Sequence, residues 1–171
     1  MFDNVGKDDL IMAFFPCVRF SEQAQINFNG HSYAQMKWDD YKKLEYAKNF
    51  HDELSKFYTL VTELTMICIK KGIRLIIENP YNDQHYLVKY WPIKAKIIIR
   101  DRQKEGDYYK KPTQFFFVNC DPENNFIFEP VTYVESKTIR GTRNKVTRSL
   151  IAPGFAYRFI KTYLLDQEVA A

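Results

Sequence analysis

Apolar positions recur at helical spacing over one long stretch in the first half of the chain. From residue 39 to residue 71 there is no Gly or Pro. Apolar residues return there at steps of three and four, at Leu44, Ala47, Phe50, Leu54, Phe57, Val61, Leu64 and Cys68. This spacing draws one apolar stripe along a helix. Asp39 and Asp40 suit its N-terminal end and Gly72 suits its C-terminal cap, so the pattern predicts a long helix ending near Lys71.

Short apolar runs stand on both sides of this helix. Residues 9–14 precede it and residues 73–77 follow it, and each run predicts a strand buried on both faces. Strand, long helix and strand make a βαβ unit, so the two strands are expected to be parallel with a right-handed crossover.

The second half predicts shorter elements. A helical piece around 84–91 precedes a third apolar run at 95–99. An aromatic strand at 113–119 is expected to pair back as a hairpin with Phe126-Ile127-Phe128, and a helix follows from about 154 to 165. We therefore expect one α/β domain over residues 1–171, with a parallel βαβ core at 8–100. A β-hairpin region follows at 112–130, then a basic loop and C-terminal helix at 136–166.

Composition narrows the class of protein. With 46% hydrophobic and 27% charged residues, the chain is neither disordered nor fibrous. Its net charge of +4 is too mild to indicate nucleic-acid binding by itself. Three scattered cysteines and three scattered histidines favour no disulfide framework, no metal site and a reducing cytoplasm. The chain shows no apolar run of membrane-spanning length and no signal peptide at its start, so no membrane association is expected.

Two reactive side chains follow the first two predicted strands. Cys17 lies in Phe15-Pro16-Cys17 and Glu78 opens Glu78-Asn79-Pro80. Ligands bind at the carboxyl ends of parallel strands, so a thiol and a carboxyl group are expected to be neighbours there, as a nucleophile and an acid/base partner. The alternatives are a cysteine acting as a small buried hydrophobe and a glutamate acting as a cap or ion-pair partner. A carboxylate raises a thiol pKa, which disfavours a mechanism like that of cysteine proteases.

The same residues resemble a known family. The segment 15–21, Phe-Pro-Cys-Val-Arg-Phe-Ser, resembles the Phe-Pro-Cys-Gln-x-Phe-Ser motif of DNA cytosine-5 methyltransferases. Residues 78–80 resemble their Glu-Asn-Val motif, in the Glu-Asn-Pro form of phage-type relatives. Gly106-Asp107 followed by Lys111-Pro112-Thr113 is similar to a Lys-x-Thr segment of those relatives, and residues 148–156 are similar to their Arg-Ser-x-Ile-x-Pro-x-x-Ala ending. The four matches stand in family order over roughly residues 9–165.

The resemblance implies a partial Rossmann-like methyltransferase sheet and a specific chemistry. Such an enzyme flips a cytosine out of double-stranded DNA. By resemblance, Cys17 attacks carbon six as a thiolate, and Glu78 hydrogen-bonds the ring nitrogen and the exocyclic amine. A methyl group then passes from S-adenosylmethionine to carbon five, and the cysteine is eliminated. The setting implied is the cytoplasm of a bacterial or phage-infected cell.

Further residues are expected to contact substrate or DNA. By position in the matched motifs these are Pro16, Arg19, Ser21, Asn79, Lys111 and Thr113. The segment 136–152 holds no acidic residue, and its basic residues are Lys137, Arg140, Arg143, Lys145 and Arg148. Such a segment can neutralise DNA phosphates without reading sequence. An ordinary solvated loop is the alternative for this segment.

The chain also departs from the family pattern. Val18 replaces the motif glutamine, and the Gln-x-Arg-x-Arg motif of many members is absent. The family's cofactor-binding half, with its glycine-rich turn, comes first, but only eight residues precede the first strand here, whereas one βαβ unit needs about thirty. Cofactor-binding residues are therefore unassigned. A separate polypeptide with the missing half, a permuted arrangement, or a degenerate, non-catalytic nucleic-acid-binding remnant each account for this, and chance motif matches in an ordinary α/β protein are a further alternative.

Overall fold

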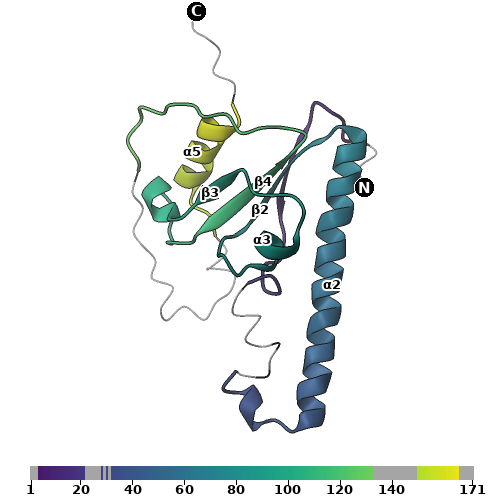
Figure 1. Ribbon diagram of the computed structural model, residues 1–171. Coiled ribbons are helices and arrows are strands. Elements are labelled where there is room, and N and C mark those ends of the chain that lie inside the picture. Colours follow the sequence, from purple (N-terminus) through teal and green to yellow (C-terminus); the bar gives the residue numbers. More distant parts are fainter. Residues whose placement is uncertain (1–3, 22–27, 29, 31, 133–149, 166–171) are drawn as a thin grey trace, which may run out of the picture.

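The chain folds as an α/β structure around a four-stranded mixed sheet (Figure 1). The computed structural model describes residues 4–21, 28, 30, 32–132 and 150–165. The strands are β1 (Leu10–Phe14), β2 (Arg74–Pro80), β3 (Ile97–Ile99) and β4 (Thr113–Val118), in the order β1-β2-β4-β3. The α-helices are α2 (Asp40–Lys71), α3 (Tyr86–Tyr90) and α5 (Pro153–Tyr163), with 3-10 turns η1 (Gln35–Lys37) and η2 (Arg102–Glu105).

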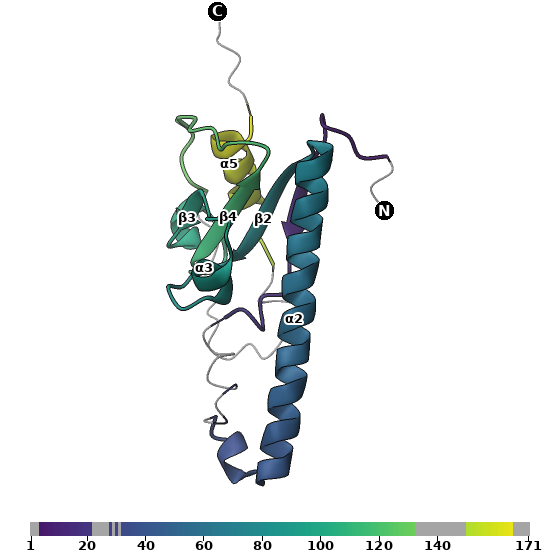
Figure 2. The same cartoon turned by 45° about the vertical axis from the view of Figure 1, so that its right-hand side comes forward.

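The predicted βαβ unit is confirmed. β1 and β2 pair in parallel, with Leu10 opposite Arg74 and Phe14 opposite Glu78. Helix α2 connects them and extends well past the sheet at its N-terminal end (Figures 1 and 2). The Asp39 side chain caps this helix by accepting a hydrogen bond of 2.8 Å from the Lys42 backbone N–H.

The predicted hairpin between 113–119 and Phe126–Phe128 is wrong. β4 pairs antiparallel with β2 on one side and with β3 on the other, so it has no free edge for another strand. The 123–125 segment instead runs beside α5, where the backbone N–H groups of Glu123 and Asn125 donate to carbonyls of the last helical turn. Phe126 and Phe128 are exposed.

The burial expected for the first strand is also wrong. β1 is an edge strand of the sheet formed by the described residues, and Leu10 and Phe14 are exposed. The second strand behaves as predicted, because β2 lies between β1 and β4 and its Leu75–Ile77 core is fully buried. An apolar run therefore did not distinguish a central strand from an edge strand.

The two faces of the sheet pack against different helices. Leu75 and Ile77 share one core with residues of α2 and α3, including Val61 and Leu87. Ile76 faces the other way and packs with α5. Because side chains alternate along a strand, Glu78 continues the α5 face of β2 and Asn79 continues the α2 and α3 face. No helix in the described ranges is long and apolar enough to cross a membrane.

We predict that Gly72→Ala lowers the free energy of unfolding by about 1 kcal/mol, because Gly72 ends α2 with a left-handed φ of 68°. The nearest atom to an added Cβ is 3.9 Å away, so the cost is conformational rather than steric. Gly6→Ala is the control, since a Cβ there meets nothing within 4 Å. Urea unfolding measures both variants, and equal stabilities would contradict this role of Gly72.

Candidate active site

The carboxyl ends of β1, β2 and β3 and the amino end of β4 lie at one edge of the sheet. The parallel register sets Phe14, the last residue of β1, opposite Glu78. Because β4 is antiparallel to its neighbours, its first residue, Thr113, lies opposite both Pro80 and Ile99. The Cys17 loop and the Glu78-Asn79-Pro80 segment thus lie at the same edge, as the sequence predicts, and the start of β4 joins them there.

The loop that carries Cys17 is a tight turn fixed against α3. The Cys17 carbonyl accepts hydrogen bonds from the backbone N–H groups of Phe20 (3.0 Å) and Ser21 (3.1 Å). The Phe20 ring is fully buried and stacks on Tyr86, whose backbone N–H donates to the Phe20 carbonyl at 2.9 Å. Ser21 Oγ donates to the Val18 carbonyl at 3.3 Å. The half-buried Cys17 therefore stands on a backbone held from both sides, whereas Pro16 is exposed.

Arg19 ties the same turn to α2. Its guanidinium makes a 2.6 Å ion pair with Glu53 and lies 4.5 Å from the centre of the Phe50 ring. This places Arg19 in a structural contact with the helix. A contact between Arg19 and DNA stays a prediction, and it would compete with Glu53.

Glu78 is buried beside an arginine that sequence reasoning missed. Arg102 is 1% exposed, and its Nη1 lies 3.7 Å from Glu78 Oε1. The same guanidinium pairs with the buried Asp107 and lies 4.6 Å from the centre of the Phe155 ring of α5. Arg102 stands in a charged loop whose composition is typical of solvated surface, so the only available signal was its position just after a predicted strand.

Burial raises the pKa of Glu78 above its ordinary value. The charges of Lys111 and Arg102 oppose this shift and that of Asp107 adds to it, but the loss of water around the carboxyl group is the larger effect. Glu78 consequently holds a proton at higher pH than an exposed glutamate. A protonated carboxyl group can donate a hydrogen bond as well as accept one.

Thr113 and Lys111, which were predicted to contact substrate, lie beside this pair. The Thr113 hydroxyl donates to the Lys111 carbonyl at 3.0 Å and accepts from Arg102 Nη1 at 3.5 Å. Thr113 is fully buried, so its hydroxyl positions Arg102 in the absence of substrate. Lys111 is half-buried and its charge acts on Glu78.

The opposite face of the edge holds a second polar group. Asn79 is fully buried there, and its register partner Gln114 donates from Nε2 to the Pro80 carbonyl at 2.9 Å. Gln114 Nε2 also lies 3.4 Å from Nδ1 of the buried His85.

Buried polar atoms without a hydrogen-bond partner gather at this edge of the described structure. They include Glu78 Oε1, both amide atoms of Asn79, His85 Nε2 and Arg102 Nε. Native structures leave few such atoms, so each of them calls for a partner that the described residues do not supply.

A small cavity opens between β1, β4 and α5 at the Glu78 carboxyl group. Its volume is about 80 Å³ and its lining is apolar apart from Glu78 and Arg102. The apolar lining includes Met12, Phe14, Phe115, Phe155 and Phe159. Small-molecule pockets usually exceed roughly 300 Å³, so this cavity does not fit S-adenosylmethionine.

The described glycines do not supply a cofactor cradle either. Those with positive φ are Gly30, Gly72 and Gly106. Gly72 and Gly106 each end a helix or 3-10 turn, and Gly30 lies well beyond the end of β1, so none forms a tight turn from a strand into a helix. Neither this small cavity nor the described glycines therefore supply an S-adenosylmethionine site beside Glu78. In the described part of the chain, no group of three His, Cys, Asp or Glu side chains is arranged to hold a metal ion.

The predicted DNA-contacting residues Lys137, Arg140, Arg143, Lys145 and Arg148 lie outside the described residues. The described residues on either side of them do approach the site. The Ala152 backbone N–H donates to Asp107 Oδ1 at 2.8 Å, and a Cβ on Gly106 would lie 3.3 Å from the Thr132 carbonyl oxygen. Both flanks of the basic segment are thus held next to the loop that contacts Glu78.

Comparisons with protein-family models, with curated proteins and with solved structures find no match to this chain. The methyltransferase resemblance consequently rests on the motifs quoted above, and the function is a proposal from those motifs and the site geometry.

We predict that Arg102→Met lowers the free energy of unfolding by about 3–5 kcal/mol, because it leaves two buried carboxyl groups without their cation. Arg158→Met is the matched control. Arg158 pairs with Glu105 at 3.0 Å but is partly exposed, so its loss should cost about 1 kcal/mol or less. Chemical unfolding of both variants tests this difference, and similar losses would contradict a central role for Arg102.

We also predict that His85 makes the fold sensitive to mild acid. Burial lowers the pKa of His85 from 6.5 to about 4. Between these values the unfolded chain binds a proton that the folded chain excludes, so the free energy of unfolding falls as the pH falls, by up to about 3 kcal/mol. His85→Leu should remove this part of the pH dependence, and His51→Leu, on the exposed side of α2, should keep it. Denaturant unfolding at pH 7 and at pH 4.5 measures this difference. If His85→Leu loses as much free energy of unfolding between the two pH values as the wild type does, His85 is not the group responsible.

Proposed function

We propose that this chain is the catalytic and DNA-binding portion of a DNA cytosine-5 methyltransferase. The observation that carries the proposal is the parallel pairing of β1 with β2, which sets the Cys17 turn and the buried Glu78 at one edge of the sheet. A nucleophile and a carboxyl group in this arrangement suit a flipped cytosine, whose carbon six and ring nitrogen need the two groups from different directions.

The chemistry uses this chain's own residues at two atoms of the base. The Cys17 thiolate forms a bond from Sγ to carbon six, and the displaced electron pair moves into the ring toward carbon five and the ring nitrogen. Glu78 donates a hydrogen bond to that nitrogen, and the raised pKa of its carboxyl group supports this role. Once carbon five carries the added methyl group, it gives up its hydrogen as a proton to water. The electrons of that carbon–hydrogen bond restore the double bond between carbons five and six, the bond between sulfur and carbon six breaks, and the thiolate leaves.

S-adenosylmethionine is the proposed methyl donor, and it supplies an electrophilic methyl group for carbon five. The cavity beside Glu78 and the described glycines do not fit this cofactor, so we assign its binding to a partner segment that these residues do not include. The edge strand β1, exposed at Leu10 and Phe14, and the cavity beside Phe14 border the part of the sheet nearest to the Cys17 turn, which is where such a partner segment has to deliver the methyl group.

The DNA partner is proposed to be double-stranded. Lys111 lies close enough for its charge to act on Glu78, and the flanks of the basic segment are held beside Asp107. Backbone phosphates near the target base therefore meet positive charge at the same edge of the sheet. The proposed setting is the cytoplasm of a bacterial or phage-infected cell.

We predict a covalent adduct between Cys17 and duplex DNA that carries 5-fluorocytosine. The last step requires carbon five to lose its hydrogen as a proton, and fluorine in that position cannot be lost as a cation. The enzyme therefore stays bound to the base after methyl transfer. The experiment mixes the chain and S-adenosylmethionine with the duplex, together with the partner segment that binds this cofactor, which is sought first in the coding DNA directly upstream of residue 1. Denaturing electrophoresis and peptide mass spectrometry then locate the bond, which is expected on Cys17.

Matched cysteine variants make this test specific. Cys17→Ser should lose the adduct, whereas Cys120→Ser should keep it, since Cys120 follows β4 at the opposite edge of the sheet. Glu78→Gln should slow adduct formation by about 10²-fold or more, as is typical on losing an acid/base group. Absence of any wild-type adduct, or an unchanged adduct in Cys17→Ser, would contradict catalysis and favour the alternative, a non-catalytic nucleic-acid-binding relative.

A further inference from the structure

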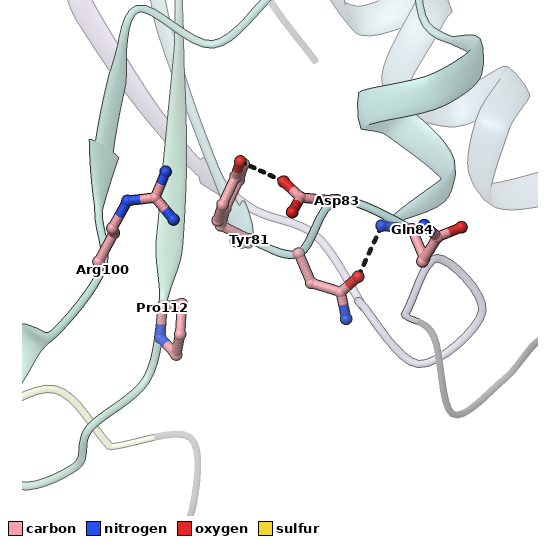
Figure 3. Close-up of a pocket in the computed structure, with 6 residues that line it drawn as sticks. Tyr81, Asp83, Gln84, Arg100 and Pro112 are labelled. Carbon is pink, nitrogen blue, oxygen red and sulfur yellow. Dashed lines mark hydrogen bonds between the residues drawn. The ribbon is translucent and has the colours of Figure 1, made fainter.

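A second and larger pocket lies at the same edge of the sheet, outside the Cys17 and Glu78 site. Its volume is about 440 Å³, and residues 81–84 line it together with Arg100 and Pro112. Tyr81 directly follows β2 and Arg100 directly follows β3, so the two parallel strand ends flank the pocket. Figure 3 shows the Arg100 guanidinium directed toward the Tyr81 ring, at 5.5 Å from its centre.

Hydrogen bonds within the loop hold the pocket in shape. The Tyr81 backbone N–H donates to the Pro112 carbonyl at 2.9 Å, which links the loop to the residue before β4. The Tyr81 hydroxyl donates to Asp83 at 2.6 Å, and the Asn82 side chain accepts from the Gln84 backbone N–H at 2.7 Å. The aromatic ring is consequently presented at a fixed angle beside the guanidinium.

The pocket lining carries one positive and one negative side chain, Arg100 and Asp83. Arg100 is exposed and makes no ion pair within the described residues. The carboxylate of Asp83 sits at the far side of the ring, where it is engaged by the Tyr81 hydroxyl. An anionic group is therefore favoured beside Arg100 and disfavoured beside Asp83, and the Tyr81 ring, over which the guanidinium stands, supplies the aromatic part of the lining.

An unstacked nucleotide matches this lining. Bases stack on tyrosine rings, and the planar guanidinium of arginine binds phosphate through paired hydrogen bonds. We infer that this pocket binds one nucleotide of the DNA substrate, with its base stacked on Tyr81 and its phosphate bound by Arg100. The inference rests on the proposed function only in that it takes DNA as the substrate.

The pocket is separate from the target cytosine. Tyr81 stands three residues beyond Glu78, which is roughly 10 Å along an extended chain. The pocket therefore holds a nucleotide near the flipped base in the strand and not the flipped base itself. Holding this nucleotide fixes the strand on which the enzyme acts.

Photo-crosslinking tests the stacking contact. Short single-stranded and duplex DNA with 5-iodouracil in place of thymine is bound to the chain and irradiated. The expected crosslink is on Tyr81. Tyr81→Leu should remove it and weaken DNA binding by about tenfold, and Tyr81→Phe should retain both because the ring remains. Crosslinks confined to other residues, or equal losses in Tyr81→Phe, would overturn the stacking assignment.

Salt dependence tests the phosphate contact. Arg100→Gln should weaken binding and lower the slope of log affinity against log salt by about one. Lys70→Gln removes the same charge at the end of α2, beside the opposite edge of the sheet, and should leave affinity and slope unchanged. Equal effects of the two variants would overturn a specific phosphate site.

The outcomes separate this inference from the proposed function. A Cys17 adduct that forms normally in Tyr81→Leu and Arg100→Gln, with unchanged DNA affinity, overturns the pocket and leaves the methyltransferase proposal standing. A Tyr81 crosslink without any Cys17 adduct supports the pocket and overturns the catalytic proposal. Displacement of DNA from Tyr81 by free adenosine or S-adenosylmethionine, but not by deoxycytidine monophosphate, would overturn a DNA nucleotide as the occupant.

Discussion

The buried guanidinium of Arg102 holds the functional edge of this protein together. It is 1% exposed and lies between carboxyl groups from two parts of the chain, Glu78 at the end of β2 and Asp107 in the following loop. It also contacts Thr113 at the start of β4 and the Phe155 ring of α5. A buried cation is tolerated only when its partners are in place, so this one group requires four segments to meet.

The same constraint explains how a carboxyl group can be buried and still be available for chemistry. Two carboxyl groups share one arginine, and Asp107 takes the closer contact and also accepts from the Ala152 backbone N–H. Glu78 is left at 3.7 Å, so burial outweighs the nearby positive charges and its pKa rises. The arrangement keeps Glu78 in position without fixing it in the ionised form, which is what hydrogen bonding to a ring nitrogen needs.

The sheet topology supplies the rest of the edge. Since β4 is antiparallel to β2 and β3, its first residue returns to the carboxyl ends of its neighbours. The Cys17 turn, Lys111 and the Tyr81 loop therefore lie along a single border. Helix α2 packs on one face of the sheet and helix α5 on the other (Figures 1 and 2).

Local sequence patterns predicted where the helices and strands lie better than they predicted how these elements are buried and paired. Helix α2 and its caps were predicted from residue spacing, because a long apolar stripe at steps of three and four between Asp39 and Gly72 fits only a helix. The parallel pairing of β1 with β2 followed from the length of that helix. The exposed edge position of β1 did not follow, because apolar runs are similar in edge and central strands. The partner of β4 was missed because it depends on which strand edges are open.

The residues of the candidate site were likewise predicted only in part. Cys17 and Glu78 were predicted because they follow apolar runs and match short motifs. Arg102 was not predicted, since a charged loop with alternating signs looks solvated until its fold buries one member. The pocket beside Tyr81 was equally hidden, because Tyr81 and Arg100 are 19 residues apart and meet only through the pairing of β2 and β3 with β4.

The central claim is that Cys17 adds to carbon six of a cytosine that Glu78 holds. Addition makes carbon five basic, so it takes a proton from solvent and then loses its original hydrogen when the thiolate leaves. Exchange of that hydrogen for deuterium in duplex DNA, followed by mass spectrometry, reports this chain's own residues without any methyl donor. The account predicts exchange at cytosine with wild type and Cys120→Ser, and none with Cys17→Ser. No exchange with wild type, or equal exchange in Cys17→Ser, would contradict it.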